Sequence, residues 1–245
     1  MPSRSQQRQC PARQPRVSTV LAFDCAVSGQ GVAVVRDGVS LAILFEEGRD
    51  QAARLLPSIA AALEQAGVAR TQLDLIAVTT GPGSFTGVRV GLSAARGLAV
   101  GLGIPLAGIA TTSVLRAQAP ASDRLVVAAV DTRLGDWFCT IGESADGAEA
   151  SPFAATAEDL AVRLAGRACL IVGKDVAPLV RSLQAAGVEA TGHEGPPDPA
   201  VLGRLADGLG VGAWRLRNRA EGLPRPLYLR GVNITLPDGA RRTVE

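Results

Sequence analysis

Glycine and hydroxyl residues gather in one short turn, which is the first place where this chain has residues suited to chemistry. Gly81 and Gly83 lead the turn, and Gly87 follows Ser84 and Thr86. An apolar run precedes the turn and a long segment of small residues follows it. Where such a turn opens a helix, its free N–H groups can bind a phosphate or another anion. The alternative is a structural turn in which Ser84 or Thr86 caps the helix.

Two well-known phosphate-binding patterns do not fit this turn. The dinucleotide pattern G-x-G-x-x-G requires a glycine where this chain has Thr86. The P-loop pattern requires a lysine after its last glycine, whereas Val88 and Arg89 follow Gly87. The sequence therefore favours a structural turn, and an anion or nucleotide site remains the alternative.

Two aspartates, Asp24 and Asp131, occupy equivalent places in the two halves of the chain. Each ends an apolar, strand-like run and begins a turn. Carboxylates at paired strand ends can hold Mg²⁺, which prefers oxygen ligands. The alternative, which we favour, is that both aspartates form turns by accepting hydrogen bonds from their own backbone.

Other residues that support catalysis are scarce. The only histidine, His193, lies in a stretch rich in glycine and proline that we interpret as a loop, so a metal site is not expected. The four cysteines are scattered without a C-x-x-C pair, which is typical of a reducing, cytoplasmic compartment. Neither H-E-x-x-H nor G-x-S-x-G occurs, so we expect no catalytic residue and no protease activity.

Composition indicates a globular protein. Of the 245 residues, 47% are hydrophobic and 20% are charged, and no uncharged apolar stretch is long enough to cross a membrane. The net charge of +2 predicts no strong general attraction to nucleic acid. Aromatic residues make up only 3% of the chain, which argues against a surface on which RNA bases stack.

The first half of the chain alternates strand and helix patterns. Three antiparallel strands are predicted by residue 47, with Asp37 and Gly38 as a hairpin signal. Residues 49–67 have apolar positions at three- and four-residue steps and predict a helix, which Pro57 should kink or make irregular. Residues 73–79 predict a buried strand that leads into the glycine turn, and residues 104–119 predict a short strand and a helix.

The second half repeats the plan of strand, aspartate, turn and strand, which suggests two duplicated lobes. It continues with a helix, a strand and two further helices, the last at residues 199–212. We expect an α/β protein in which each lobe is a mixed β-sheet with flanking helices. The expected boundaries are a disordered tail at 1–16, an N-terminal lobe at 17–113, a C-terminal lobe at 114–232 and a flexible tail at 233–245.

The helix predicted after the glycine turn is unusually rich in small residues. Gly87, Gly91 and Ala95 recur every four residues and form one ridge. A glycine inside a helix costs about 1 kcal/mol relative to alanine, so close contact with another backbone is the expected compensation. That backbone is either the protein's own sheet or the helix of a partner, and Arg89 and Arg96 face either a partner or water.

Five segments in this order and spacing identify a resemblance. They are "LAFDCA", "ARLLPSI", "VTTGPGSFTGVRVGLSAARGLA", "VAAVDTRLGDWF" and "PLYLR". The chain resembles the bacterial TsaB (YeaZ) family over most of its length. The resemblance implies the actin/Hsp70-like (ASKHA) fold of two related lobes. It also implies a non-catalytic subunit that acts with a TsaD-like transferase and a TsaE-like ATPase to make threonylcarbamoyladenosine at position 37 of tRNAs that read ANN codons.

The resemblance implies where the partner binds. The two helices that begin near "RDQAARLLP" and "GPGSFTGVR" should form a helical bundle with the TsaD-like subunit, and a homodimer would use an overlapping surface. The expected interface residues are Leu55, Leu56, Ile59, Leu63, Gly87, Arg89, Gly91, Ala95 and Leu98. The expected anion or nucleotide contacts, if that site exists, are Asp24, Gly81, Gly83, Ser84, Thr86 and Asp131.

The resemblance also bears on cofactors. No cofactor of its own is expected for this chain, because ATP, Mg²⁺ and the catalytic metal belong to the partner subunits, and tRNA is reached only through the complex. On this interpretation Gly87→Leu or Gly91→Leu blocks assembly and leaves the monomer folded. The alternative function is a stand-alone ATPase or phosphotransferase of the same fold.

Overall fold

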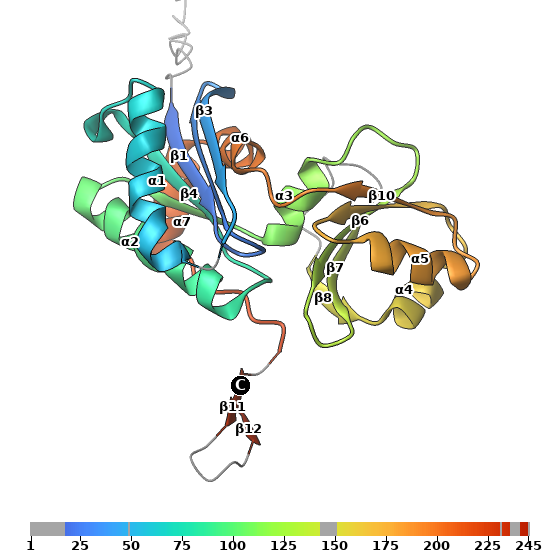
Figure 1. Ribbon diagram of the computed structural model, residues 1–245. Coiled ribbons are helices and arrows are strands. Elements are labelled where there is room, and N and C mark those ends of the chain that lie inside the picture. The colour runs from blue at the N-terminus through green and yellow to red at the C-terminus, as the bar shows by residue number, and fades with distance from the viewer. Residues whose placement is uncertain (1–17, 49, 143–150, 231, 236–240, 245) are drawn as a thin grey trace, which may run out of the picture.

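The computed structural model describes residues 18–48, 50–142, 151–230, 232–235 and 241–244 (Figure 1). The expected tail at 1–16 lies outside these residues. The described chain forms two lobes, each built on a five-stranded sheet. Within the described residues, no helix combines the length and the hydropathy needed to cross a bilayer.

The first sheet has the strand order β3-β2-β1-β4-β5. Its strands are β1 (Thr19–Asp24), β2 (Gln30–Arg36), β3 (Val39–Glu46), β4 (Leu75–Thr79) and β5 (Leu106–Ile109). β1, β2 and β3 pair antiparallel, which confirms the predicted three-stranded meander. β4 pairs parallel with both β1 and β5, so the sheet is mixed.

The second sheet has the strand order β10-β9-β6-β7-β8. Its strands are β6 (Leu125–Asp131), β7 (Trp137–Gly142), β8 (Phe153–Ala155), β9 (Cys169–Gly173) and β10 (Ala190–Glu194). β6 pairs antiparallel with β7 and parallel with β9, as β1 pairs with β2 and β4. When the second order is read backwards, the two sheets have the same topology, which confirms the predicted duplication and the ASKHA fold.

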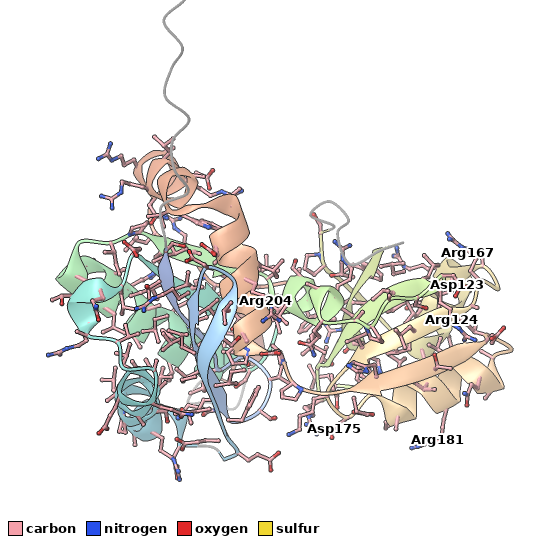
Figure 2. The ribbon with its side chains drawn as sticks, turned by 90° about the horizontal axis from the view of Figure 1, so that it is seen from above. Asp123, Arg124, Arg167, Asp175, Arg181 and Arg204 are labelled. Atoms are coloured by element: carbon pink, nitrogen blue, oxygen red, sulfur yellow. The ribbon has the colours of Figure 1, made fainter. Side chains whose placement is uncertain are left out.

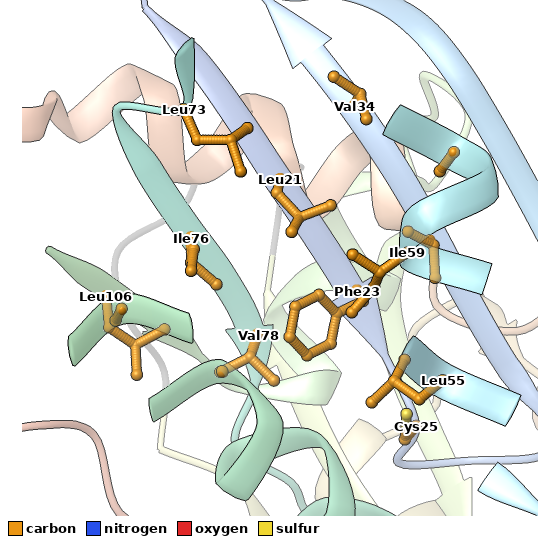
Figure 3. Close-up of a cluster of buried hydrophobic side chains, with 14 of the residues drawn as sticks. Leu21, Phe23, Cys25, Val34, Leu55, Ile59, Leu73, Ile76, Val78 and Leu106 are labelled. Atoms are coloured by element: carbon orange, nitrogen blue, oxygen red, sulfur yellow. The ribbon is translucent and has the colours of Figure 1, made fainter. Parts of the chain in front are cut away.

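Helices α1 (Gln51–Gln65) and α2 (Phe85–Leu102) cover one face of the first sheet. Their buried residues pack on the central strands around Leu21, Phe23 and Val78 (Figure 3). A short 3₁₀ helix, η1 (Arg70–Gln72), connects α1 to β4.

Helices α6 (Pro199–Leu209) and α7 (Val211–Glu221) pack on the opposite face of the first sheet. The prediction that residues 199–221 belong to the second lobe is therefore wrong. Leu202 and Ala206 of α6 are buried against Ala22 and Val35 of the first sheet. α7 was not predicted, because its sequence is rich in arginine and only Trp214 of this helix is buried.

The second lobe is covered on both faces by helices that the sequence predicts. α4 (Ala157–Leu164) and α5 (Ala177–Ala185) bury Leu160 and Leu179 on one face, and α3 (Thr111–Ala117) buries Leu115 on the other. His193 lies in β10, paired with Val172, so its prediction as a loop residue is wrong. In the expected C-terminal tail, β11 (Val232–Thr235) and β12 (Arg241–Val244) pair antiparallel.

The glycine turn lies directly on the end of β1. A Cβ atom at Gly83 would lie less than 3.0 Å from the Ala26 carbonyl oxygen, and one at Gly87 would lie less than 3.0 Å from the Cys25 carbonyl oxygen. The Ser84 N–H donates to the same Ala26 carbonyl at 2.6 Å. The Ser84 hydroxyl accepts from the Gly87 N–H at 3.2 Å, which makes Ser84 the helix N-cap, one of the two predicted.

We expect Gly87→Ala to lower the free energy of unfolding by about 2 kcal/mol or more, because the added methyl group must displace backbone at Cys25. Gly97→Ala in the same helix is the matched control. A Cβ at Gly97 meets no atom within 4 Å, so this change should raise stability by about 0.5–1 kcal/mol. Urea denaturation of both variants measures the difference, and equal stabilities would contradict the close approach.

Candidate functional site

Two hollows meet at the start of α2. The inter-lobe cavity lies between the glycine turn and the β6–β7 turn and has a volume of about 520 Å³. The α1–α2 groove lies on the outer side of these helices and has a volume of about 570 Å³. Phe85, the first residue of α2, lines both. The turn that the sequence singles out therefore separates two candidate binding surfaces.

Only part of the expected anion site lines the inter-lobe cavity. Gly83, Ser84 and Asp131 line it, together with many apolar side chains. Asp24 is buried beneath the turn and is only 2% exposed. Thr86 lines the α1–α2 groove instead. The structure thus does not bring the six residues together around one ligand.

Asp24 and Asp131 act as turn residues, as the favoured interpretation predicts. An Asp24 Oδ1 accepts from the Ala26 N–H at 3.1 Å and from the Thr79 hydroxyl at 2.5 Å. An Asp131 Oδ1 accepts from the Arg133 N–H at 2.7 Å. Each aspartate therefore bonds the backbone two residues ahead, at the equivalent place in its own lobe.

Burial changes the protonation of Asp24. Removal from water raises the pKa of the Asp24 carboxyl to about 6, although the hydrogen bonds from Thr79 and Ala26 act in the opposite direction. Desolvation is the larger effect because the charged form loses its hydration. Asp24 is thus a structural carboxyl close to half-charged near pH 6.

The cations around the inter-lobe cavity already have carboxylate partners. Lys174 Nζ lies 2.9 Å from a Glu47 oxygen and joins the two lobes. Arg133 pairs with Asp131 at 3.4 Å and with Asp175 at 3.7 Å. Asp175 lies on the second lobe, on the side that faces the first (Figure 2). An anionic ligand would have to compete with these pairs.

An irregular segment at residues 223–230, which we call the crossing segment, connects α2 to the second lobe. The Leu227 N–H donates to the Thr80 carbonyl at 2.8 Å, and the Arg96 guanidinium donates to the Pro224 carbonyl. Arg230 forms an ion pair with Asp136 in the β6–β7 turn. Arg96 therefore faces this segment, and neither a partner nor open water as expected.

The α1–α2 groove is mainly apolar and lined by small side chains. Its lining residues are Ala52, Leu55, Leu56, Phe85, Thr86, Arg89, Val90, Ser93 and Ala94. Leu56 and Phe85 are 56% and 41% exposed, which is high for large apolar residues. Within the described chain, Tyr228 packs on Phe85 and Arg89 at one edge of this surface, and Leu56 stays exposed. Apolar surface of this kind is typical of a protein-binding site.

Six of the expected interface residues are buried, and of these only Leu55 also borders the α1–α2 groove. Gly87, Gly91 and Ala95 are buried on the inner side of α2, and a Cβ at Gly91 would lie 3.4 Å from Val78 of the sheet. Leu55, Ile59 and Leu63 of α1 are each no more than 6% exposed and belong to the core. The small-residue ridge therefore packs on the protein's own sheet. Because both positions are buried against the protein's own backbone or sheet, we expect Gly87→Leu and Gly91→Leu to destabilise the monomer itself.

The remaining expected residues, Leu56, Arg89 and Leu98, lie at or near the surface. The sequence interpretation missed the outward face of α2. This face is formed by Val90, Ser93, Ala94, Gly97 and Gly101. The sequence did contain a signal for this face, because Gly97 and Gly101 form a second small-residue ridge on a different side of the helix.

Among the described residues, neither the thiols nor the metal-binding side chains are arranged as a reactive site. Cys25, Cys139 and Cys169 are buried, and desolvation raises the pKa of the Cys139 thiol to about 12 and that of Cys169 to about 11. Such thiols are almost entirely protonated near neutral pH. In the described residues, no group of three or more His, Cys, Asp or Glu side chains is placed to hold a metal ion.

Comparison with known proteins shows which family the chain resembles. The family profile "TsaD: tRNA N6-adenosine threonylcarbamoyltransferase" matches residues 46–165. The Escherichia coli protein named tRNA threonylcarbamoyladenosine biosynthesis protein TsaB is 35% identical over 121 residues, which make up 49% of this chain and 52% of that protein. The Haemophilus influenzae protein of the same name is 38% identical over 125 residues, with the same coverage of each chain.

A crystal structure from Pseudomonas aeruginosa, of an uncharacterized protein with similarity to peptidase YEAZ, agrees over the whole fold. It is 28% identical, has a TM-score of 0.69, and its alignment covers 87% of this chain and 100% of that one. The chain belongs to the TsaB (YeaZ) family. It spans about half the length of the curated TsaB relatives it matches.

The burial of Asp24 gives a testable pH dependence. Because its folded-state pKa of about 6 exceeds the unfolded value of about 3.9, its contribution to stability is complete below pH 4 and is lost as the pH rises through 6. Asp24→Asn keeps the acceptor oxygen and removes the charge. Near pH 4, we expect the variant and the parent to have the same free energy of unfolding. At pH 8, the free energy of unfolding of the variant should be higher by up to about 3 kcal/mol.

Denaturant titrations at a series of pH values measure this difference between the variant and the parent. Asp37→Asn removes one negative charge from an exposed turn and is the control for the change in net charge. Parallel stability curves for Asp24→Asn and the parent would contradict the burial of a charged carboxylate.

Proposed function

We propose that this TsaB-family chain is a non-catalytic subunit for threonylcarbamoyladenosine formation at position 37 of tRNAs that read ANN codons. In this proposal it docks a TsaD-like transferase on the α1–α2 groove and thereby activates it, together with a TsaE-like ATPase. The observation that carries the proposal is the groove itself, an apolar surface on a helix pair whose opposite side is fully packed.

The chemistry of the chain supports docking over catalysis. The sequence has one histidine, and His193 lies exposed on an outer strand of the second sheet, away from both hollows. The resemblance to the transferase implies a metal held by two histidines, which this chain cannot supply. ATP, Mg²⁺ and the catalytic metal are accordingly assigned to the partner subunits, and tRNA is reached through the complex.

The outward face of α2 suits close helix packing. Glycine, alanine and serine side chains let two helix backbones approach, so that dispersion contacts form along their length. Gly97 lies on the same side of α2 as Val90, Ser93 and Ala94, which line the groove. A second copy of this chain would use the same surface, so homodimer and heterodimer compete in this proposal. The proposed site of action is the cytoplasm.

The inter-lobe cavity favours one alternative function, a stand-alone ATPase or phosphotransferase. Its volume of about 520 Å³ suits a small molecule, and the N-terminus of α2 opens beside it at Ser84. Two observations argue against an ATPase or phosphotransferase. The cations that line the cavity already have carboxylate partners, and the sequence lacks a P-loop lysine. ATP turnover by the purified chain alone, abolished by Asp131→Ala, would establish this alternative.

Gly97→Leu is expected to weaken binding of the TsaD-like subunit by about tenfold or more, because the new branch holds the two helices apart. The monomer should stay folded, since a Cβ at Gly97 meets no atom within 4 Å. Isothermal titration calorimetry with the TsaD-like subunit of the same organism measures the effect, and size-exclusion chromatography shows whether the homodimer is lost as well.

Gly208→Leu on α6 is the matched control. Gly208 is also an exposed helical glycine with open space around its Cβ position, but it lies on the opposite face of the first sheet. This variant should bind as the parent does. If Gly97→Leu binds the partner with parental affinity, the docking groove is refuted.

A further inference from the structure

Three side chains form a stacked cluster at the edge of the α1–α2 groove. The Arg89 guanidinium carbon lies 3.4 Å from the centre of the Phe85 ring and 5.6 Å from that of the Tyr228 ring. The Arg89 Nε donates to the Tyr228 hydroxyl at 2.8 Å. The two ring centres are 5.8 Å apart. Arg89 thus contacts both rings and the Tyr228 hydroxyl, although it is exposed to solvent.

Arg89 differs from the other arginines around these hollows in having no carboxylate partner in the described part of the chain. Arg54, next to the groove, pairs with Glu46, and Arg133 and Arg230 at the inter-lobe cavity pair with Asp131 and Asp136. Arg89 instead contacts the Tyr228 hydroxyl and the rings of Phe85 and Tyr228. No carboxylate of the described residues therefore neutralises its charge.

The hydrogen bond to Tyr228 uses Nε and leaves the two terminal nitrogens of Arg89 for another molecule. A guanidinium binds a carboxylate best through two parallel N–H···O bonds, which its planar shape allows. The contact with the Phe85 ring and the hydrogen bond to Tyr228 hold the Arg89 side chain in place in advance, so less side-chain entropy remains to be lost on binding. Arginine, tyrosine and phenylalanine are also enriched at protein interfaces.

We propose that Arg89 is the polar anchor of the docking groove and binds an Asp or Glu side chain of the TsaD-like partner. The partner segment is an amphipathic helix whose apolar side chains enter the groove beside Leu56 and Val90. Its carboxylate lies over Arg89, at the edge where Phe85 is exposed. The proposal rests on the docking function above and adds the chemistry that selects and orients the partner.

The test uses Arg89→Gln, which removes the charge and the planar guanidinium while keeping polar N–H donors. We expect the Kd for the TsaD-like subunit to rise about 10- to 50-fold, as for a central interface arginine. The dependence of the Kd on salt concentration should become weaker, because an ion pair is lost. Arg89→Lys should recover only part of the affinity, because lysine keeps the charge without the paired N–H groups.

Arg204→Gln is the matched control, an exposed arginine on α6 that lies away from the groove (Figure 2). It should leave both the Kd and its salt dependence unchanged. Thermal unfolding should show that all three variants are folded, since Arg89 and Arg204 are exposed.

The outcomes separate the anchor from the docking groove. If Arg89→Gln binds with parental affinity and salt dependence while Gly97→Leu does not bind, the anchor is refuted and the groove stands. If Arg89→Lys binds as tightly as the parent, the two-bond geometry is refuted. If both Arg89→Gln and Gly97→Leu bind normally, the groove and the anchor fail together.

Discussion

The contact between the glycine turn and the end of β1 positions both hollows of this protein. Gly83 and Gly87 approach the carbonyl groups of Ala26 and Cys25 so closely that no side chain fits between them. The Ser84 N–H completes the contact by donating to Ala26. Because α2 starts at this turn, the contact fixes which side of α2 is buried and which side forms the groove.

The same turn lies between the inter-lobe cavity and the α1–α2 groove, and it contacts a residue that is distant in the sequence. Phe85 lines both the inter-lobe cavity and the α1–α2 groove, and Tyr228 reaches from the crossing segment to stack with it. The crossing segment continues to the second lobe through the ion pair of Arg230 with Asp136. The crossing segment thus joins the second lobe to the edge of the groove through contacts at both of its ends.

Much of the fold was predictable because duplication is visible in a single sequence. The aspartate at the end of each central strand identified two equivalent lobes, and apolar periodicity located the core helices. The interface was harder to predict. The ridge at Gly87, Gly91 and Ala95 and the ridge at Gly97 and Gly101 look alike in sequence, and only the packing of α2 on its sheet decides which is buried.

The errors outside α2 have similar physical causes. α6 has the periodicity of an ordinary amphipathic helix, which does not reveal that it returns to the first sheet. The cluster of Phe85, Arg89 and Tyr228 joins residues separated by more than half of the chain, so no local pattern could reveal it. Conversely, the roles of Asp24 and Asp131 were predictable, because each bonds backbone only two residues away.

The central claim is that this chain acts by docking and performs no chemistry itself. The most direct measurement is a reconstitution of threonylcarbamoyladenosine formation on unmodified tRNA, with the TsaD-like and TsaE-like subunits added or omitted one at a time. We predict that the modified nucleoside forms only when this chain and the TsaD-like subunit are both present. Formation of the nucleoside by this chain without the TsaD-like subunit would contradict the account.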